Sequence, residues 1–108
     1  MLLANAEHVP VSFSGEMTIS NIEAAYADLG AALRQDGPVV MDISGVTEAD
    51  LTFVQLIESA RRKAAETGCD FTLRHPADGA VLGVLQRGGF LDDDTSDRVQ
   101  FWLQGASQ

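Results

Sequence analysis

The sequence predicts an α/β protein in which a small, largely parallel β-sheet carries amphipathic helices. Short apolar runs suited to strands alternate along the chain with segments whose apolar residues recur at the 3.6-residue period of a helix. The run at 39–43, Val-Val-Met-Asp-Ile, is apolar with one interruption, as is typical of a strand covered by other elements on both faces. Strands joined through helices pair in parallel, and because of its apolar run we place 39–43 at the centre of the sheet.

The size and charge of the chain limit what it can be. With 108 residues, of which 45% are hydrophobic, it can build one core, so we expect a single domain over 1–108. No apolar run approaches the roughly 18 residues of a membrane span, and the first residues lack the basic flank of a signal peptide, which predicts a cytoplasmic protein without membrane insertion. The net charge of −9 disfavours nucleic acid as a partner and favours a protein with a basic or mixed-charge surface.

The first elements are predicted to be two short strands and a helix. Residues 2–5 and 8–13 have strand character, and the proline inside the second places it near a sheet edge. Ser20 and Glu23 have the spacing of a capping box, which predicts a helix that runs to about Gln35.

The segment after the central strand is predicted to be a turn, residues 44–50, that leads into a helix over 52–67. Asp50 is the natural N-cap, because its carboxylate can accept bonds from the free amides of the first helical turn. Gln55 and Glu58 are expected on the outer face, Glu58 in an ion pair with Arg62 four residues later.

The second half continues the alternation. We expect a strand at 70–74, a helix at 77–87, and a brief strand or extended plug at 90–91. A last helix that begins at 95 or 96 and ends near 103 is preferred, with a strand at 98–103 as the alternative because Val, Phe and Trp also favour sheets.

Candidates for chemistry are few, and the sequence predicts no catalytic residue, cofactor or metal. It has no glycine-rich phosphate loop and no paired His or Cys at metal spacing, and its two histidines, His8 and His75, lack a nucleophile motif. The lone Cys69 is expected to be a buried structural thiol. Asp42 interrupts the central strand and is either bonded locally, which we favour, or a site carboxylate. The acidic run 92–94 lacks the pattern of a calcium loop.

The hydroxyl of Thr52 lies in the first turn of the helix that Asp50 caps. A helix N-terminus tolerates a phosphate, so Thr52 is a candidate for phosphorylation, although a second capping role is the preferred interpretation from the sequence.

The string from Val39 to Asp50, followed by a helix that ends in glycine and then a strand, resembles the STAS domain family, the sulphate transporter and anti-sigma-factor antagonist domains. Residues 11–17, Val-Ser-Phe-Ser-Gly-Glu-Met, are similar to the strand and Gly-Glu-Leu turn that open those domains, and 85–90 resembles their third helix and its Gly-Phe ending. The resemblance implies a small mixed, mostly parallel β-sheet with helices packed on one face, and a non-enzymatic switch protein.

The same resemblance identifies the site positions. Phosphorylatable members begin this helix with Asp, Ser, Ser or Thr, and Gly, and the matching residues here are Asp50, Leu51, Thr52 and Phe53. The usual acceptor is therefore a leucine, which implies a surface that docks rather than one that is switched. Gln55 and the 60–62 region resemble a divergent bacterial branch of the family.

Three hypotheses of function follow. The first is a regulatory module, similar to an anti-anti-sigma factor, that docks its 44–58 edge on a kinase-type anti-sigma factor or a histidine-kinase relative; the partner-binding residues would be Asp50, Leu51, Thr52, Gln55 and Glu58. The second is a STAS subunit of a lipid-transporting ABC ATPase complex, which would use the same helix to hold the ATPase. A small enzyme is the weakest alternative.

Overall fold

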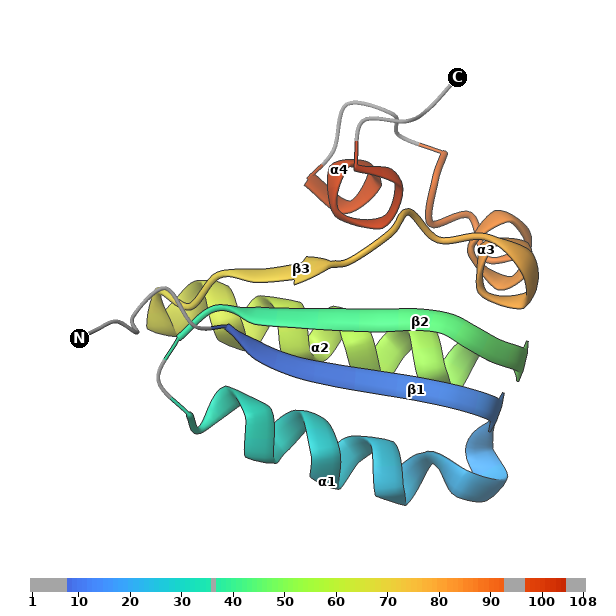
Figure 1. Ribbon diagram of the computed structural model, residues 1–108. Helices are drawn as coiled ribbons and strands as arrows, with labels where there is room; N and C mark the ends of the chain where they lie inside the picture. Colours follow the sequence, from blue (N-terminus) through green and yellow to red (C-terminus); the bar gives the residue numbers. More distant parts are fainter. Residues whose placement is uncertain (1–7, 36, 93–96, 105–108) are drawn as a thin grey trace.

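The computed structural model describes residues 8–35, 37–92 and 97–104, which form three parallel strands and the helices around them (Figure 1). The sheet order is β1-β2-β3, so the strand that begins at residue 39 is central, as predicted. The α/β class with a small parallel sheet is confirmed, while the strand predicted at 2–5 lies outside the described residues. The elements are β1 (Val9–Met17), the 3-10 turn η1 (Ile19–Asn21), α1 (Ile22–Leu33), β2 (Val39–Ala49), α2 (Leu51–Thr67), β3 (Phe71–Leu73), α3 (Gly79–Arg87) and α4 (Asp97–Leu103).

The core lies between the sheet and its helices. In β2, Val39, Met41 and Ile43 alternate with less buried residues and are themselves buried, as expected of one face of a strand. On β1, Phe13 points the same way and meets Phe53 of α2 edge to face, with ring centroids 5.6 Å apart. The opposite face of β1 is open, and its residues Pro10, Ser12 and Ser14 are exposed.

The predicted turn at 44–50 is wrong, because β2 continues through it to Ala49. Over this stretch β2 still pairs with β1, with Ser14 beside Gly45 and Met17 beside Ala49, although the register shifts twice. The two strands approach closely here: a Cβ at residue 45 would lie 2.9 Å from the Ser14 Cβ. Gly45 is therefore required for the close approach of β1 and β2. From the sequence alone, the same glycine is interpreted as part of a turn.

The entry to α1 also differs from the prediction. The capping box is made by Thr18 and Asn21, and not by Ser20 and Glu23. The Thr18 amide donates to Asn21 Oδ1 at 3.0 Å, and η1 intervenes before the α-helix begins. The capping box therefore has the predicted spacing but lies two residues earlier in the chain, so the prediction of a capping box was right and its position was wrong.

The last elements resolve two alternatives. The described residues 97–103 are helical, as preferred, so the strand alternative there is wrong. Residues 88–92 form a turn without strand pairing, and Phe90 and Leu91 pack half-buried against the core, as the plug alternative required.

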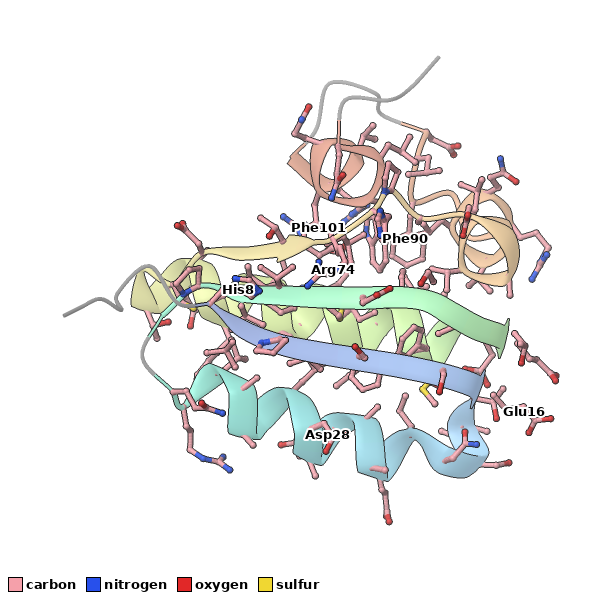
Figure 2. The ribbon with its side chains drawn as sticks, viewed as in Figure 1. His8, Glu16, Asp28, Arg74, Phe90 and Phe101 are labelled. Atoms are coloured by element: carbon pink, nitrogen blue, oxygen red, sulfur yellow. The ribbon has the colours of Figure 1, made fainter. Side chains whose placement is uncertain are left out.

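Helix α4 is attached to α2 through a buried carboxylate. Trp102 is fully buried, and its Nε1 donates to Glu58 Oε2 at 2.7 Å. Arg61 bonds the other oxygen of Glu58 at 2.9 Å, and Arg98 lies 3.6 Å away. Phe101 of α4, which Figure 2 labels, stacks on the ring of Phe71 in β3, with ring centroids 5.6 Å apart.

This arrangement corrects the prediction for Glu58. It was expected on the outer face of α2 in an ion pair with Arg62, but it is only 7% exposed and its partner on the helix is Arg61. Glu58 is buried because α4 packs over this part of α2 in the folded protein. A buried carboxylate needs charged and hydrogen-bonded partners, and the Trp102 and Arg98 partners come from residues about forty positions later.

Candidate partner-docking site

The site lies where β2 passes into α2. The carboxyl ends of parallel strands meet at one edge of a sheet, and here β1 and β2 end together with Met17 paired to Ala49. The turn that follows β1 then contacts the start of α2, since the amide of Ile19 donates to Asp50 Oδ2 at 2.9 Å. Two segments about thirty residues apart are thereby joined at one carboxylate.

Asp50 is the N-cap of α2, as predicted. Its Oδ1 accepts from the Thr52 amide at 3.0 Å and from the Thr52 hydroxyl. The bond from that hydroxyl is the largest cause that holds the pKa of Asp50 below its ordinary value, and the amide of Ile19 acts in the same direction. The carboxylate therefore stabilises the helix in its charged form.

Thr52 and Leu51 differ in what they offer to a partner. Thr52 is half-buried and its hydroxyl donates to Asp50, while no amide among the described residues donates to that hydroxyl, so Thr52 supports the Asp50 cap and is not the second cap that was expected. Leu51 is 44% exposed, and Ile19, which is tied to the same carboxylate, is 65% exposed. Gln55 lies one turn after Leu51 and is exposed. We call this surface the docking patch; it comprises Ile19, Asp50, Leu51, Thr52 and Gln55.

The sequence missed Ile19 and misplaced Glu58. Ile19 is an isolated apolar residue before a helix, and only the fold brings it beside Asp50; no local signal marks it. Glu58 is buried under α4 and does not present its carboxylate to the surface.

The remaining candidates have local roles. Asp42 accepts from the amide and hydroxyl of Ser44 at 2.9 and 2.7 Å, and these bonds, the hydroxyl first, lower its pKa. Arg74 lies 4.0 Å away. His75 is exposed, as is His8, and the thiol of Cys69 is half-buried rather than fully buried.

Two further findings concern only the described part of the chain. Within it, no group of three or more His, Cys, Asp or Glu side chains is arranged to hold a metal ion. None of the helices described there has the length and apolar character to cross a membrane. Of the acidic run at 92–94, residues 93 and 94 lie outside the described residues.

The fold and the patch define a class: a small α/β domain with a parallel sheet whose strand ends present a capped helix N-terminus flanked by exposed apolar side chains. The family model described as Mlab, STAS domain matches residues 2–93, and the chain therefore belongs to the STAS domain family. Domains of this family are generally non-enzymatic binding modules. The comparison with curated proteins gave no match.

The cap gives a first testable prediction. Asp50→Ala should lower the free energy of unfolding at neutral pH by about 1–2 kcal/mol, because α2 loses its N-cap and the Ile19 amide loses its acceptor. Asp50→Asn keeps an acceptor oxygen and should lose less. Urea unfolding followed by circular dichroism measures both.

The pH dependence follows from the direction of the pKa shift. The Asp50 carboxyl has a lower pKa in the folded than in the unfolded chain, so its stabilisation is present above about pH 4 and is lost as pH falls through the folded pKa. Between pH 5 and pH 3 the wild type should therefore lose more stability than Asp50→Asn; equal losses would show that this carboxylate is not stabilising in its charged form.

Proposed function

We propose that the chain is a non-enzymatic regulatory module that docks the edge at residues 44–58 on a protein partner. The observation that carries this proposal is the presence of two exposed apolar residues, Leu51 and Ile19, in segments that Asp50 joins at a capped helix N-terminus. Large apolar side chains that gather on a surface and are rimmed by polar groups are typical of protein contacts. Asp50, Thr52 and Gln55 supply that polar rim.

A permanent contact with a partner fits this surface better than a contact that phosphorylation switches on and off. The hydroxyl of Thr52 is bonded to Asp50, so a phosphate on it would break that bond and bring its charge beside a carboxylate. The neighbouring position, where phosphorylatable STAS domains carry serine, is Leu51. An apolar side chain there contributes to a contact and cannot accept a phosphate.

Two classes of partner follow from the STAS resemblance. A kinase-type anti-sigma factor or histidine-kinase relative would release the domain by phosphorylating it, and Thr52 is then the candidate acceptor. The ATPase of a lipid-transporting ABC complex would hold the domain as a permanent subunit. The leucine at position 51 favours the second class, because a permanent contact gains from buried apolar area and needs no acceptor.

One experiment separates the two. The tagged chain is purified from its native host, bound proteins are identified, and the intact mass of the chain is measured in the same sample. We expect an ABC ATPase in stoichiometric amount and a chain without phosphate. A sigma-regulating kinase, with a phosphoryl mass shift that disappears in Thr52→Ala, would support the other class. If no protein is retained above the level seen with Leu51→Glu, docking through this edge is refuted.

A further inference from the structure

A groove with a volume of about 600 Å³ runs between α1 and α2. The two helices pack against each other on the helical side of the sheet (Figure 1). Its apolar walls are Leu29 and Leu33 from α1 and Leu56 and Ala60 from α2, of which Leu33 and Leu56 are half-buried and the other two are buried. Tyr26 stands at its rim and is 70% exposed.

The charge of the groove is opposite to that of the chain. The chain has 16 acidic and 7 basic residues, yet of the described residues that line the groove two are basic, Arg34 and Lys63, and none is acidic. Neither basic side chain makes an ion pair with any residue that the structure describes. The Arg34 guanidinium lies near Gly30, one turn earlier on α1, because a Cβ added at Gly30 would be 3.6 Å from its Nη1. The groove thus combines an apolar surface with two available cations.

These cations stand at one defined end. Because α1 and α2 each connect two parallel strands, they run in the same direction, and Arg34 and Lys63 lie at or near their carboxyl ends. The docking patch lies at the other end, since Leu51 begins α2 and Ile19 precedes α1. The docking patch and the two cations thus mark opposite ends of the same helix pair, and the exposed Tyr26 lies on α1 between them.

We propose that the groove binds an amphipathic helix of the docked partner, laid antiparallel to α1 and α2. Its apolar stripe packs on the half-buried Leu33 and Leu56 and on the exposed Tyr26, and its acidic first turn contacts Arg34 and Lys63. The antiparallel direction follows from the helix dipoles, because the positive amino end of the bound helix meets the negative carboxyl ends of α1 and α2. Acidic side chains also favour the first turn of a helix, which places them beside the two cations. An anionic membrane is disfavoured by the net charge of −9.

This inference rests on the proposed function only in that the helix belongs to the docked partner. The test places a photo-crosslinking amino acid at Ser59, an exposed residue on the α2 side of the groove, in the chain expressed in its native host. The matched control carries it at Ser12, exposed on the open face of the sheet. The cross-linked peptide is then sequenced.

A partner segment with apolar residues at helical period, preceded by Asp or Glu and cross-linked at Ser59 but not at Ser12, supports the proposal. A lipid adduct, a second copy of this chain, a basic or non-periodic segment, or no adduct above the Ser12 level overturns it.

Gly30 gives an independent variant pair, since both substitutions favour the helix and neither should impair folding. In Gly30→Ala the Cβ makes ordinary contact with Arg34, whereas the longer side chain of Gly30→Leu enters the groove. We expect Gly30→Leu to weaken binding of the identified segment, made as a synthetic peptide, by about tenfold or more, and Gly30→Ala by no more than about twofold. Equal affinities for the two variants would overturn the proposal.

Failure of the groove and failure of the docking patch are distinguishable. Leu51→Glu should leave the affinity for the peptide unchanged while it reduces capture of the whole partner, and Gly30→Leu should reduce both. If Leu51→Glu has no effect on capture but Gly30→Leu does, the proposed docking edge is wrong and the groove remains.

Discussion

Trp102→Ala should lower the free energy of unfolding by about 3–5 kcal/mol, the largest stability effect expected in this protein. Trp102 is fully buried and heads the largest buried side chains of the core. Truncation would leave a cavity between α4, α2 and the sheet. Since domains of this size are stable by about 5–15 kcal/mol, the loss is a large fraction of the total.

Part of this effect comes from the partner that is left behind. Glu58 would lose the Trp102 Nε1 bond while still buried beside Arg61. Trp102→Phe separates the two causes, because it keeps most of the ring and removes only the N–H; we expect a loss of about 1–3 kcal/mol. Urea unfolding followed by circular dichroism is the measurement, since the substitution removes the only tryptophan.

Tyr26→Ala is the control for this series. Its side chain is 70% exposed, so truncation should change the stability by no more than about 0.5 kcal/mol. A Trp102→Ala variant as stable as Tyr26→Ala would contradict the structure by showing that α4 is not part of the folded core.

Helix α4 also extends the domain beyond the family match. The match ends at residue 93, but the core continues to Trp102, and Phe101 covers Phe71 at the β3 edge. The amide of Ala77 donates to the Trp102 carbonyl, which ties the start of the α3 segment to α4 as well. The described residues 97–104 thus contribute to the stability of the STAS domain itself.

The features that the sequence predicted correctly depend on local chemistry. The central strand follows from the apolar run at 39–43, and the Asp50 cap follows from one residue and the amides two and three positions later. The preference for helix in the last element was also right. Asp50, Leu51 and Thr52 were found together because they are contiguous in the chain.

The features that the sequence missed depend on distant contacts. The stretch 44–49 has turn composition but is a strand, because β1 runs beside it and requires glycine at position 45. Ile19 reaches the docking patch through a bond to Asp50, and Glu58 is buried by α4. In each case the conformation or burial of the residue depends on a contact with a residue at least thirty positions away, and no local sequence pattern indicates that contact.

Leu51→Glu should abolish partner binding while the domain stays folded. Leu51 is the first residue of α2 and 44% exposed, so little core packing is lost, and a glutamate at a helix amino end is favoured by the dipole. In a complex the same change buries a charge where an apolar side chain had been, next to the Asp50 carboxylate. Apolar anchors near the centre of an interface typically contribute about 2 kcal/mol or more, so the affinity should fall by roughly 30-fold at least.

The affinity is measured by calorimetry with the purified partner, and folding by circular dichroism and the unfolding midpoint. Ser12→Glu is the matched control, because it adds the same charge at an exposed position on the open face of the sheet. Its affinity for the partner should stay within about twofold of the wild-type affinity, because Ser12 lies outside the docking patch. Wild-type affinity in Leu51→Glu would exclude the docking patch as the contact, and lost affinity in both variants would show that net charge, not this apolar side chain, controls binding.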